Sequence, residues 1–183
     1  KRKPRHPNEL PWFPYHRVPV EKYIAKTHLG SRTLSHHSSF GCPFFCNFCA
    51  VVNMAEGAWL AESAARLREL MQHMVDRWQV DAIEFHDNNF FTSEKRVAAF
   101  AEELLRRGLK IAWWGEGRID TIDKYSDASL ALMRESGCKM IFFGAETGND
   151  AILKSMNKGG IQSGAQIRAF AHHMARFDII PEY

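Results

Sequence analysis

The stretch Gly41-Cys42-Pro43-Phe44-Phe45-Cys46-Asn47-Phe48-Cys49-Ala50 contains three of the four cysteines of this 183-residue chain. The three cysteines follow the spacing C-x3-C-x2-C, and the aromatic Phe48 directly precedes the last of them. Three thiolates on one short loop are able to bind three irons of a cubane 4Fe–4S cluster, whereas ordinary clusters take four cysteines. The spacing therefore predicts metal ligation by Cys42, Cys46 and Cys49, with one iron left open to bind and activate another molecule.

A zinc site and an ordinary core are also compatible with three clustered cysteines. A structural zinc site needs a fourth protein ligand and more often begins with a C-x2-C pair. Cysteines also cluster by chance in a core that binds no metal. Disulfides are disfavoured because three cysteines within eight residues have poor geometry for stapling a fold. A reducing, cytoplasmic setting is therefore expected, and the fourth cysteine, Cys138, is expected to be a small buried apolar residue.

Composition indicates a single domain with a sizeable core, since 45% of the residues are hydrophobic. The net charge of +3 is too mild to indicate nucleic-acid binding. Basic residues gather at the start of the chain, where a solvated linker explains them better than an RNA-binding arm. No secretory signal and no apolar run of the roughly 18–20 residues that span a bilayer is visible.

Residues 1–30 are rich in proline and aromatic residues and show no clear period, which predicts an irregular but ordered connector. Residues 31–183 are expected to form the core domain. The chain begins with Lys1 and ends at Tyr183 in what reads as the opening of a fifth strand. An excised piece of a longer protein, truncated at that strand, is expected.

Hydrophobic periodicity predicts alternating strands and helices after residue 31. Expected strands lie at 33–40, 80–85, 110–114 and 139–143, with a fifth from 178. Expected helices lie at 60–78, from a cap at Thr92 or Ser93 to Gly108, from Ser126 or Asp127 to Gly137, and at 151–156 and 163–177. This alternation is typical of βαβ units with a parallel sheet. A complete eight-unit barrel takes about 250 residues, so an α/β fold with an incomplete parallel βα barrel of four to five units is expected.

In parallel barrels the side chains that carry chemistry gather at the carboxyl ends of the strands. There the first strand leads to the three loop cysteines, and the second leads to Asp87, Asn88 and Asn89. The third strand leads to Trp114, Glu116, Arg118 and Asp120, and the fourth leads to Glu146. The last three on the third strand share one face if that strand extends so far. Cysteines, carboxylates and an arginine on one rim predict a polar site able to bind metal.

The cysteine loop resembles the cluster motif of the radical S-adenosylmethionine (SAM) enzymes, C-x3-C-x-Φ-C with an aromatic residue at Φ. Further segments resemble the cobalamin-dependent branch of that superfamily. They are Leu10-Pro11-Trp12-Phe13-Pro14, Phe85-His86-Asp87-Asn88-Asn89-Phe90, Trp114-Gly115-Glu116-Gly117-Arg118-Ile119-Asp120, and Gly144-Ala145-Glu146-Thr147-Gly148 continuing to Met156-Asn157-Lys158-Gly159. Their order and positions cover nearly the whole chain.

The resemblance implies a six-unit partial barrel whose sixth strand lies beyond Tyr183. It also implies that SAM chelates the open iron and that the reduced cluster cleaves SAM to methionine and a 5′-deoxyadenosyl radical, which abstracts hydrogen from substrate. Asp87 would hold the methionine amino group, as suits a carboxylate and an ammonium. Arg118 would neutralise the methionine carboxylate, Glu146 would accept hydrogen bonds from the ribose, and Phe48 would pack against adenine.

Purely structural roles also suit these residues. Asp87 is a suitable turn cap, Arg118 and Asp120 are a suitable surface ion pair, and Glu146 suits a helix N-terminus. His36 and His37 on the first strand are expected to pack or hydrogen-bond rather than ligate metal.

The branch implies cobalamin-dependent methyl transfer to an unactivated carbon or phosphorus, with methylcobalamin as the methyl source and cobalamin on a separate N-terminal domain. It further implies a small-molecule or lipid-like substrate and an electron donor such as flavodoxin or ferredoxin. A cyclase or rearrangement enzyme, a methylthiotransferase, and a non-catalytic iron–sulfur or zinc module are the alternatives. Fold alone does not decide between them.

Overall fold

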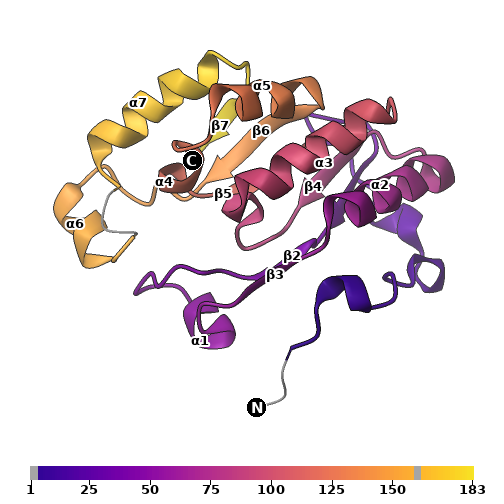
Figure 1. The fold of residues 1–183 in the computed structure, drawn as a ribbon, viewed down its shortest axis with the longest axis horizontal. Helices are drawn as coiled ribbons and strands as arrows, with labels where there is room; N and C mark the ends of the chain where they lie inside the picture. Colours follow the sequence, from indigo (N-terminus) through magenta and orange to yellow (C-terminus); the bar gives the residue numbers. More distant parts are fainter. Residues whose placement is uncertain (1–3, 159–161) are drawn as a thin grey trace.

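A computed structural model describes residues 4–158 and 162–183. Residues 1–3 of the predicted connector, and Gly159 at the end of the last segment that carries the family resemblance, lie outside the described residues. The centre of the fold is a five-stranded parallel sheet (Figure 1), in the order β1 (Thr33–His36), β4 (Ala82–Phe85), β5 (Ala112–Gly117), β6 (Cys138–Phe143) and β7 (Ile180–Glu182). The prediction of an α/β fold with an open parallel sheet is confirmed.

Four long helices cover one face of this sheet (Figure 1): α2 (Ala64–Trp78), α3 (Glu94–Arg106), α5 (Asp127–Glu135) and α7 (Gly164–Ala175). Each begins after a serine whose hydroxyl accepts a hydrogen bond from the backbone N–H three residues on, at Ser63, Ser93, Ser126 and Ser163. Such a side chain satisfies one of the donors that the first helical turn leaves free. Of the two residues predicted at each of these helix starts, Thr92 or Ser93 and Ser126 or Asp127, the observed caps are Ser93 and Ser126.

Three short helices, α1 (Val51–Ala55), α4 (Ile119–Ile122) and α6 (Asp150–Ser155), lie in the loops that follow strands. Four 3-10 turns complete the helical elements: η1 (Pro7–Glu9), η2 (Tyr15–Arg17), η3 (Val20–Lys22) and η4 (Phe90–Thr92). No described helix is long and apolar enough to cross a membrane.

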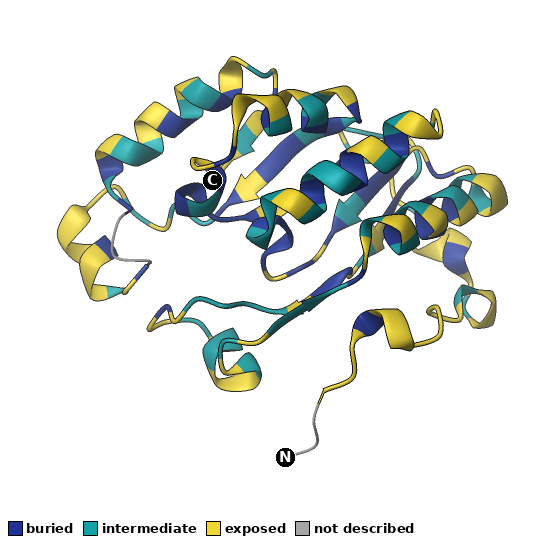
Figure 2. Cartoon of the chain, viewed as in Figure 1, coloured by how far each residue is buried: buried dark blue, intermediate teal, exposed yellow. Residues whose placement is uncertain are grey.

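The core lies between the sheet and the four helices. Alternate strand residues such as Ile83, Phe85 and Trp113 are buried there, and the exposed faces of the helices point outward (Figure 2). The Phe85 ring stacks on Phe90 at 4.4 Å, and Trp113 meets Phe100 edge-on at 5.3 Å. Because strand side chains alternate between faces, the intervening residues face the side of the sheet that the helices do not cover.

The expected first strand at 33–40 is wrong in its second half. The chain leaves the main sheet after His36, and β2 (Ser39–Gly41) pairs antiparallel with β3 (Trp59–Ala61) in a separate two-stranded ribbon. Consequently the helix expected from Leu60 begins only at Ala64. Leu60 matches the helical period, but its cross-strand pairing with Phe40 is a long-range contact that local periodicity does not reveal.

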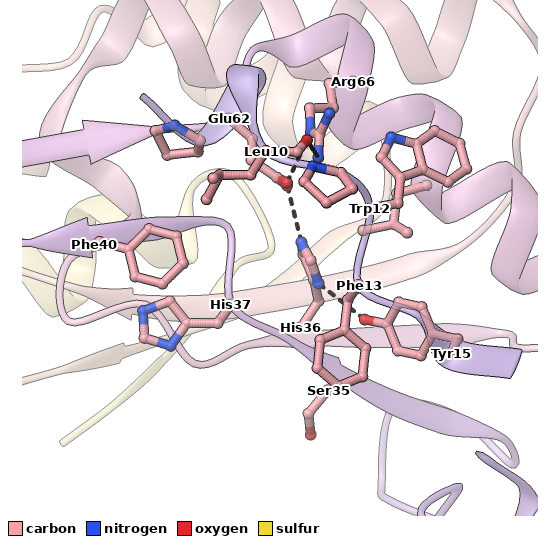
Figure 3. Close-up of a pocket in the computed structure, with 13 residues that line it drawn as sticks. Leu10, Trp12, Phe13, Tyr15, Ser35, His36, His37, Phe40, Glu62 and Arg66 are labelled. Carbon is pink, nitrogen blue, oxygen red and sulfur yellow. Dashed lines mark hydrogen bonds and ion pairs between the residues drawn. The ribbon is translucent and has the colours of Figure 1, made fainter. Parts of the chain in front are cut away.

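The N-terminal connector packs against β1 and α2, and a cavity of about 470 Å³ lies between them (Figure 3). A polar chain crosses this cavity. The Tyr15 hydroxyl is 3.1 Å from His36 Nδ1, His36 Nε2 is 2.9 Å from Glu62 Oε2, and Arg66 Nε donates to Glu62 Oε1 at 3.0 Å. His36 is thus a hydrogen-bonding residue of the core, as expected.

Burial raises the pKa of the Glu62 carboxyl, but the hydrogen bonds and charges of His36 and Arg66 outweigh burial and lower it overall. The ionised carboxylate therefore stabilises the junction between the connector and the core.

Phe143 and Phe142 are adjacent on β6, with Phe143 fully buried against Phe170 and Phe142 41% exposed on the opposite face. Phe143→Ala should lower the free energy of unfolding by about 3–5 kcal/mol through lost burial and a residual cavity. Phe142→Ala should cost less than about 1 kcal/mol. Chemical denaturation of both variants measures the difference, and equal losses would contradict the assigned faces of β6.

Glu62→Gln should lower the free energy of unfolding at pH 7 by about 1–3 kcal/mol, because the half-buried Arg66 guanidinium and the His36 ring lose the carboxylate that both of them contact. Since the folded-state pKa of Glu62 is lowered, its contribution is present above the ordinary carboxyl value of about 4.3 and is lost as pH falls through the folded-state pKa. Denaturation as a function of pH should therefore show wild type and E62Q converging in acid. The exposed Glu135→Gln serves as control, and a constant gap between wild type and E62Q would contradict the prediction.

Candidate functional site

The three loop cysteines lie between β2 and α1, near the carboxyl ends of the parallel strands. Cys46 is buried, Cys42 and Cys49 are half-buried, and all three are free thiols. Cys138, the first residue of β6, is fully buried at the amino end of that strand and is likewise a free thiol. It is the buried apolar residue that the sequence predicted, and the three loop cysteines remain without a fourth from this chain beside them.

The cysteine loop is tethered to the segment after α6, more than a hundred residues later in the chain. Asn47 N–H donates to Met156 O at 3.0 Å, and Asn47 Nδ2 donates to Ser155 O at 2.9 Å. In return, Asn157 Nδ2 donates to Phe45 O at 2.9 Å. These bonds hold the loop on both sides of Cys46 against the end of the fourth βα unit.

The donor set fits a cubane iron–sulfur cluster with one open iron. Within residues 4–158 and 162–183, no three His, Cys, Asp or Glu side chains already converge at metal-binding geometry. The loop thiols nevertheless supply three soft ligands on eight residues, and thiolates select iron–sulfur clusters or zinc. A zinc site would require a fourth protein ligand, which this loop does not contain.

Arg118 connects the third strand to the cysteine loop. β5 runs three residues past the predicted end of the strand at Trp114 and stops at Gly117. The condition for a shared strand face is therefore not met, because Arg118 precedes α4 and Asp120 lies inside α4. The Arg118 guanidinium donates to Cys46 Sγ at 3.1 Å and to both Asp120 oxygens at 2.9 and 2.7 Å. It also lies 4.0 Å from the Phe44 ring centroid.

Burial lowers the pKa of Arg118, but the hydrogen bonds and charge of Asp120, together with Cys46, reverse the effect and raise it. Arg118 and Asp120 form the ion pair that the sequence suggested. It is buried instead of lying on the surface, with side-chain exposures of 8% and 3%. A permanent cation therefore stands beside the buried thiol.

Asp87 is completely buried, and its carboxylate has a structural role. Its oxygens accept hydrogen bonds from Ser38 N–H at 2.6 Å, Ser38 Oγ at 2.7 Å and Ser39 Oγ at 2.5 Å. This role is structural but differs from the turn cap considered as the alternative, because the carboxylate fastens the break between β1 and β2. The assignment of Asp87 to the SAM amino group remains a prediction that this geometry does not support.

Phe48 and Glu146 lie on either side of Lys158, a residue that sequence reasoning missed. The buried Lys158 ammonium forms an ion pair with Glu146 Oε1 and lies 5.7 Å from the Phe48 ring centroid. Glu146 adopts a left-handed backbone conformation with φ of +63°, and Phe48 is 49% exposed. Two predicted cofactor-binding residues are thus brought together, with an aromatic face accessible beside the last cysteine.

The uncovered face of the sheet carries an acidic cavity of about 290 Å³, lined by Glu84, Phe85, Trp114, Gly115, Glu116, Phe142 and Glu182. Burial raises the pKa of Glu116. Sequence reasoning identified Glu116 and missed Glu84 and Glu182. Strand alternation would have indicated Glu84, because it lies on the face of β4 opposite the buried Ile83 and Phe85.

Several proteins of known sequence are similar to this chain. An uncharacterised methyltransferase from Pyrococcus horikoshii is 29% identical over 152 residues, which are 83% of this chain and 32% of that protein. An anaerobic magnesium-protoporphyrin IX monomethyl ester cyclase from Rubrivivax gelatinosus is 27% identical over 81% of this chain and 25% of its own. A cytidylyl-2-hydroxyethylphosphonate methyltransferase from Streptomyces wedmorensis is 23% identical over 82% and 29%. The chain thus spans about a quarter to a third of these relatives.

Solved structures share the fold. The cobalamin-dependent S-adenosylmethionine radical enzyme OxsB, with aqua-cobalamin and S-adenosylmethionine bound, superposes with a TM-score of 0.70 at 20% identity over 82% of this chain and 23% of that one. Methylornithine synthase PylB superposes with a TM-score of 0.59 at 12% identity over 81% and 42%. The model of the radical SAM superfamily matches residues 37–172, which include the cysteine loop and most of the parallel sheet. This chain belongs to the radical SAM superfamily.

Proposed function

We propose that this chain is the radical SAM core of a cobalamin-dependent methyltransferase. The observation that carries the proposal is the tethered loop of three free thiols, with Arg118 donating to Cys46 and no fourth cysteine beside it. Two relatives named as methyltransferases, and the shared fold of a cobalamin-dependent enzyme, support the finer assignment.

In this proposal Cys42, Cys46 and Cys49 hold a 4Fe–4S cluster, and SAM binds its open iron. The bound cluster supplies the electron that generates the 5′-deoxyadenosyl radical. The exposed face of Phe48 is suited to stack on adenine, while the Glu146–Lys158 pair offers a carboxylate and an ammonium to the ribose and the methionine carboxylate. The Arg118 guanidinium already donates hydrogen bonds to Asp120 and to Cys46. In this proposal it therefore acts on the cluster more directly than on SAM.

The proposal places cobalamin on another domain of the full-length protein, with residues 4–30 as the connector that packs on β1 and α2. A small-molecule substrate and a reducing partner such as flavodoxin or ferredoxin complete the reaction. The similarity to two anaerobic cyclases supports a second candidate, in which the radical drives ring formation. Formation of S-adenosylhomocysteine from SAM by the cobalamin-loaded protein distinguishes methyl transfer from a reaction that yields 5′-deoxyadenosine alone.

The three loop cysteines should be required for a cluster that responds to SAM, and Cys138 should not. Cys46→Ala should lose nearly all iron after anaerobic reconstitution of the full-length protein, because a cluster with two protein ligands is not retained. Cys138→Ala is the matched control, since that thiol is buried at the other end of the sheet. Electron paramagnetic resonance of the reduced protein, with and without SAM, is the measurement. A wild-type cluster indifferent to SAM, or bound zinc, would overturn the proposed function.

Phe48→Ala should weaken SAM binding roughly two- to tenfold, the equivalent of about 0.5–1.5 kcal/mol of aromatic stacking. Phe45→Ala is the control, because Phe45 is a similarly exposed ring on the same loop, at 55% against 49%. Equilibrium binding of SAM to the reconstituted protein measures both effects. Equal weakening by the two variants would argue against a specific role for Phe48.

A further inference from the structure

The hydrogen bond between Arg118 and Cys46 joins two buried side chains that are 72 residues apart in the sequence. Nη1 of the guanidinium donates to Cys46 Sγ at 3.1 Å, and the two residues are 6% and 7% exposed. Cys46 is the buried member of the three loop cysteines, since Cys42 and Cys49 are half-buried. A hydrogen bond shielded from water in this way is electrostatically stronger than one in solvent. A side chain that follows the third parallel strand thus contacts a predicted cluster ligand directly.

Three contacts fix the orientation of this guanidinium. Nε and Nη2 donate to the two Asp120 carboxylate oxygens at 2.9 and 2.7 Å, and the Phe44 ring centroid lies 4.0 Å from Cζ. A bidentate carboxylate holds the plane of a guanidinium, and an aromatic ring packs well against its face. Asp120 is itself 3% exposed, so water does not compete for its oxygens. The remaining nitrogen, Nη1, is consequently held against Cys46.

The charge of this arrangement favours a sulfur that carries negative charge. The Arg118–Asp120 pair is neutral as a whole, whereas the group that contacts the sulfur is the cationic donor. Hydrogen bonds to the sulfurs are among the factors that set the reduction potential of an iron–sulfur cluster. Because a reduced cluster carries one more negative charge than an oxidised one, a cationic donor at a ligand sulfur stabilises the reduced form more. Such a donor therefore raises the reduction potential.

We propose that Arg118 is a positioning residue that holds the cluster-ligating Cys46 sulfur by a hydrogen bond and thereby raises the reduction potential of the cluster, and that Asp120 acts through Arg118 by fixing its orientation. The inference rests on the proposed function, from which it takes the 4Fe–4S cluster. The electron comes from the reducing partner of that proposal, a flavodoxin or ferredoxin, which is oxidised by one electron as the cluster is reduced by one. The guanidinium keeps its protons, and no covalent bond forms or breaks.

The test is potentiometry of the full-length, anaerobically reconstituted protein, followed by electron paramagnetic resonance without SAM. The double variant Arg118→Met, Asp120→Asn removes the donor without changing the net charge and leaves no buried carboxylate unpaired. Its midpoint potential should be more negative than that of the wild-type protein. Arg118→Lys keeps the positive charge but lacks the planar fork that joins Cys46 to Asp120. The midpoint potential of R118K should therefore lie between those of the wild type and the double variant.

An ion pair at the opposite edge of the sheet provides the matched control. Arg134 and Asp178 pair at the amino ends of β6 and β7, whereas the cysteine loop lies near the carboxyl ends of the strands. The double variant Arg134→Met, Asp178→Asn makes the same chemical change there. It should leave the midpoint potential at the wild-type value, and an equal negative shift in this control would overturn the inference.

A wild-type midpoint potential in R118M/D120N would overturn the inference and leave the proposed function intact, because a purely structural ion pair does not affect the potential. A midpoint potential of R118K at or above the wild-type value would also overturn it, since positive charge alone would then account for the effect. A wild-type cluster that is indifferent to SAM would instead defeat the proposed function, while the potentials still test the inference. A wild-type protein that binds no cluster would overturn both.

If the Arg118 variants do not retain iron, the second measurement is pulsed electron paramagnetic resonance of the reduced wild-type cluster after labelling of arginine guanidinium nitrogens with ¹⁵N. Among the described residues, the guanidinium recorded in contact with a loop cysteine is that of Arg118. A ¹⁵N coupling to the cluster supports the hydrogen bond to Cys46, and the absence of a coupling overturns it. The unlabelled protein gives the background signal.

Discussion

The buried carboxylate of Asp87 is the interaction on which the site depends. It accepts three hydrogen bonds from Ser38 and Ser39, at the point where the chain leaves the parallel sheet and enters the small ribbon that carries the cysteine loop. The same Ser38 hydroxyl accepts a hydrogen bond from the Arg96 guanidinium at 2.7 Å. A buried charge is tolerated only when it is paired and hydrogen-bonded, and Asp87 satisfies this condition through backbone and hydroxyl donors from the first βα unit.

This constraint explains why the site forms from segments distant in sequence. The second strand supplies Asp87 and so fixes the direction in which the first unit leaves the sheet. Farther along the chain, the third unit supplies Arg118 to Cys46, and the fourth supplies the backbone oxygens that hold Asn47. Each of these units thus contributes one contact beyond the carboxyl end of its strand, in accordance with the general behaviour of βα folds. The cysteine loop is consequently held from several sides before any cofactor is bound.

The polar side chains beside the cysteine loop differ in charge from those on the uncovered face of the sheet. Beside the thiols the buried polar group is a donor, the Arg118 guanidinium at Cys46, and a cationic donor suits a sulfur ligand. On the uncovered face of the sheet the side chains of Glu84, Glu116 and Glu182 line the adjoining cavity. Membership of the radical SAM superfamily explains why a donor lies beside the cysteine thiols.

The sequence by itself determined the alternation of the parallel strands with the long helices, and the family, because these depend on local periodicity and on the short spacing of Cys42, Cys46 and Cys49. It also indicated Arg118 and Glu146 as residues of the rim. Only the tertiary structure revealed the pairing of Phe40 with Leu60, the role of Asp87 in the fold, and the contribution of Lys158. These features arise from contacts between residues far apart in the chain. Burial and hydrogen-bond partners decide the role of each polar side chain, and both are properties of the folded molecule that no local pattern specifies.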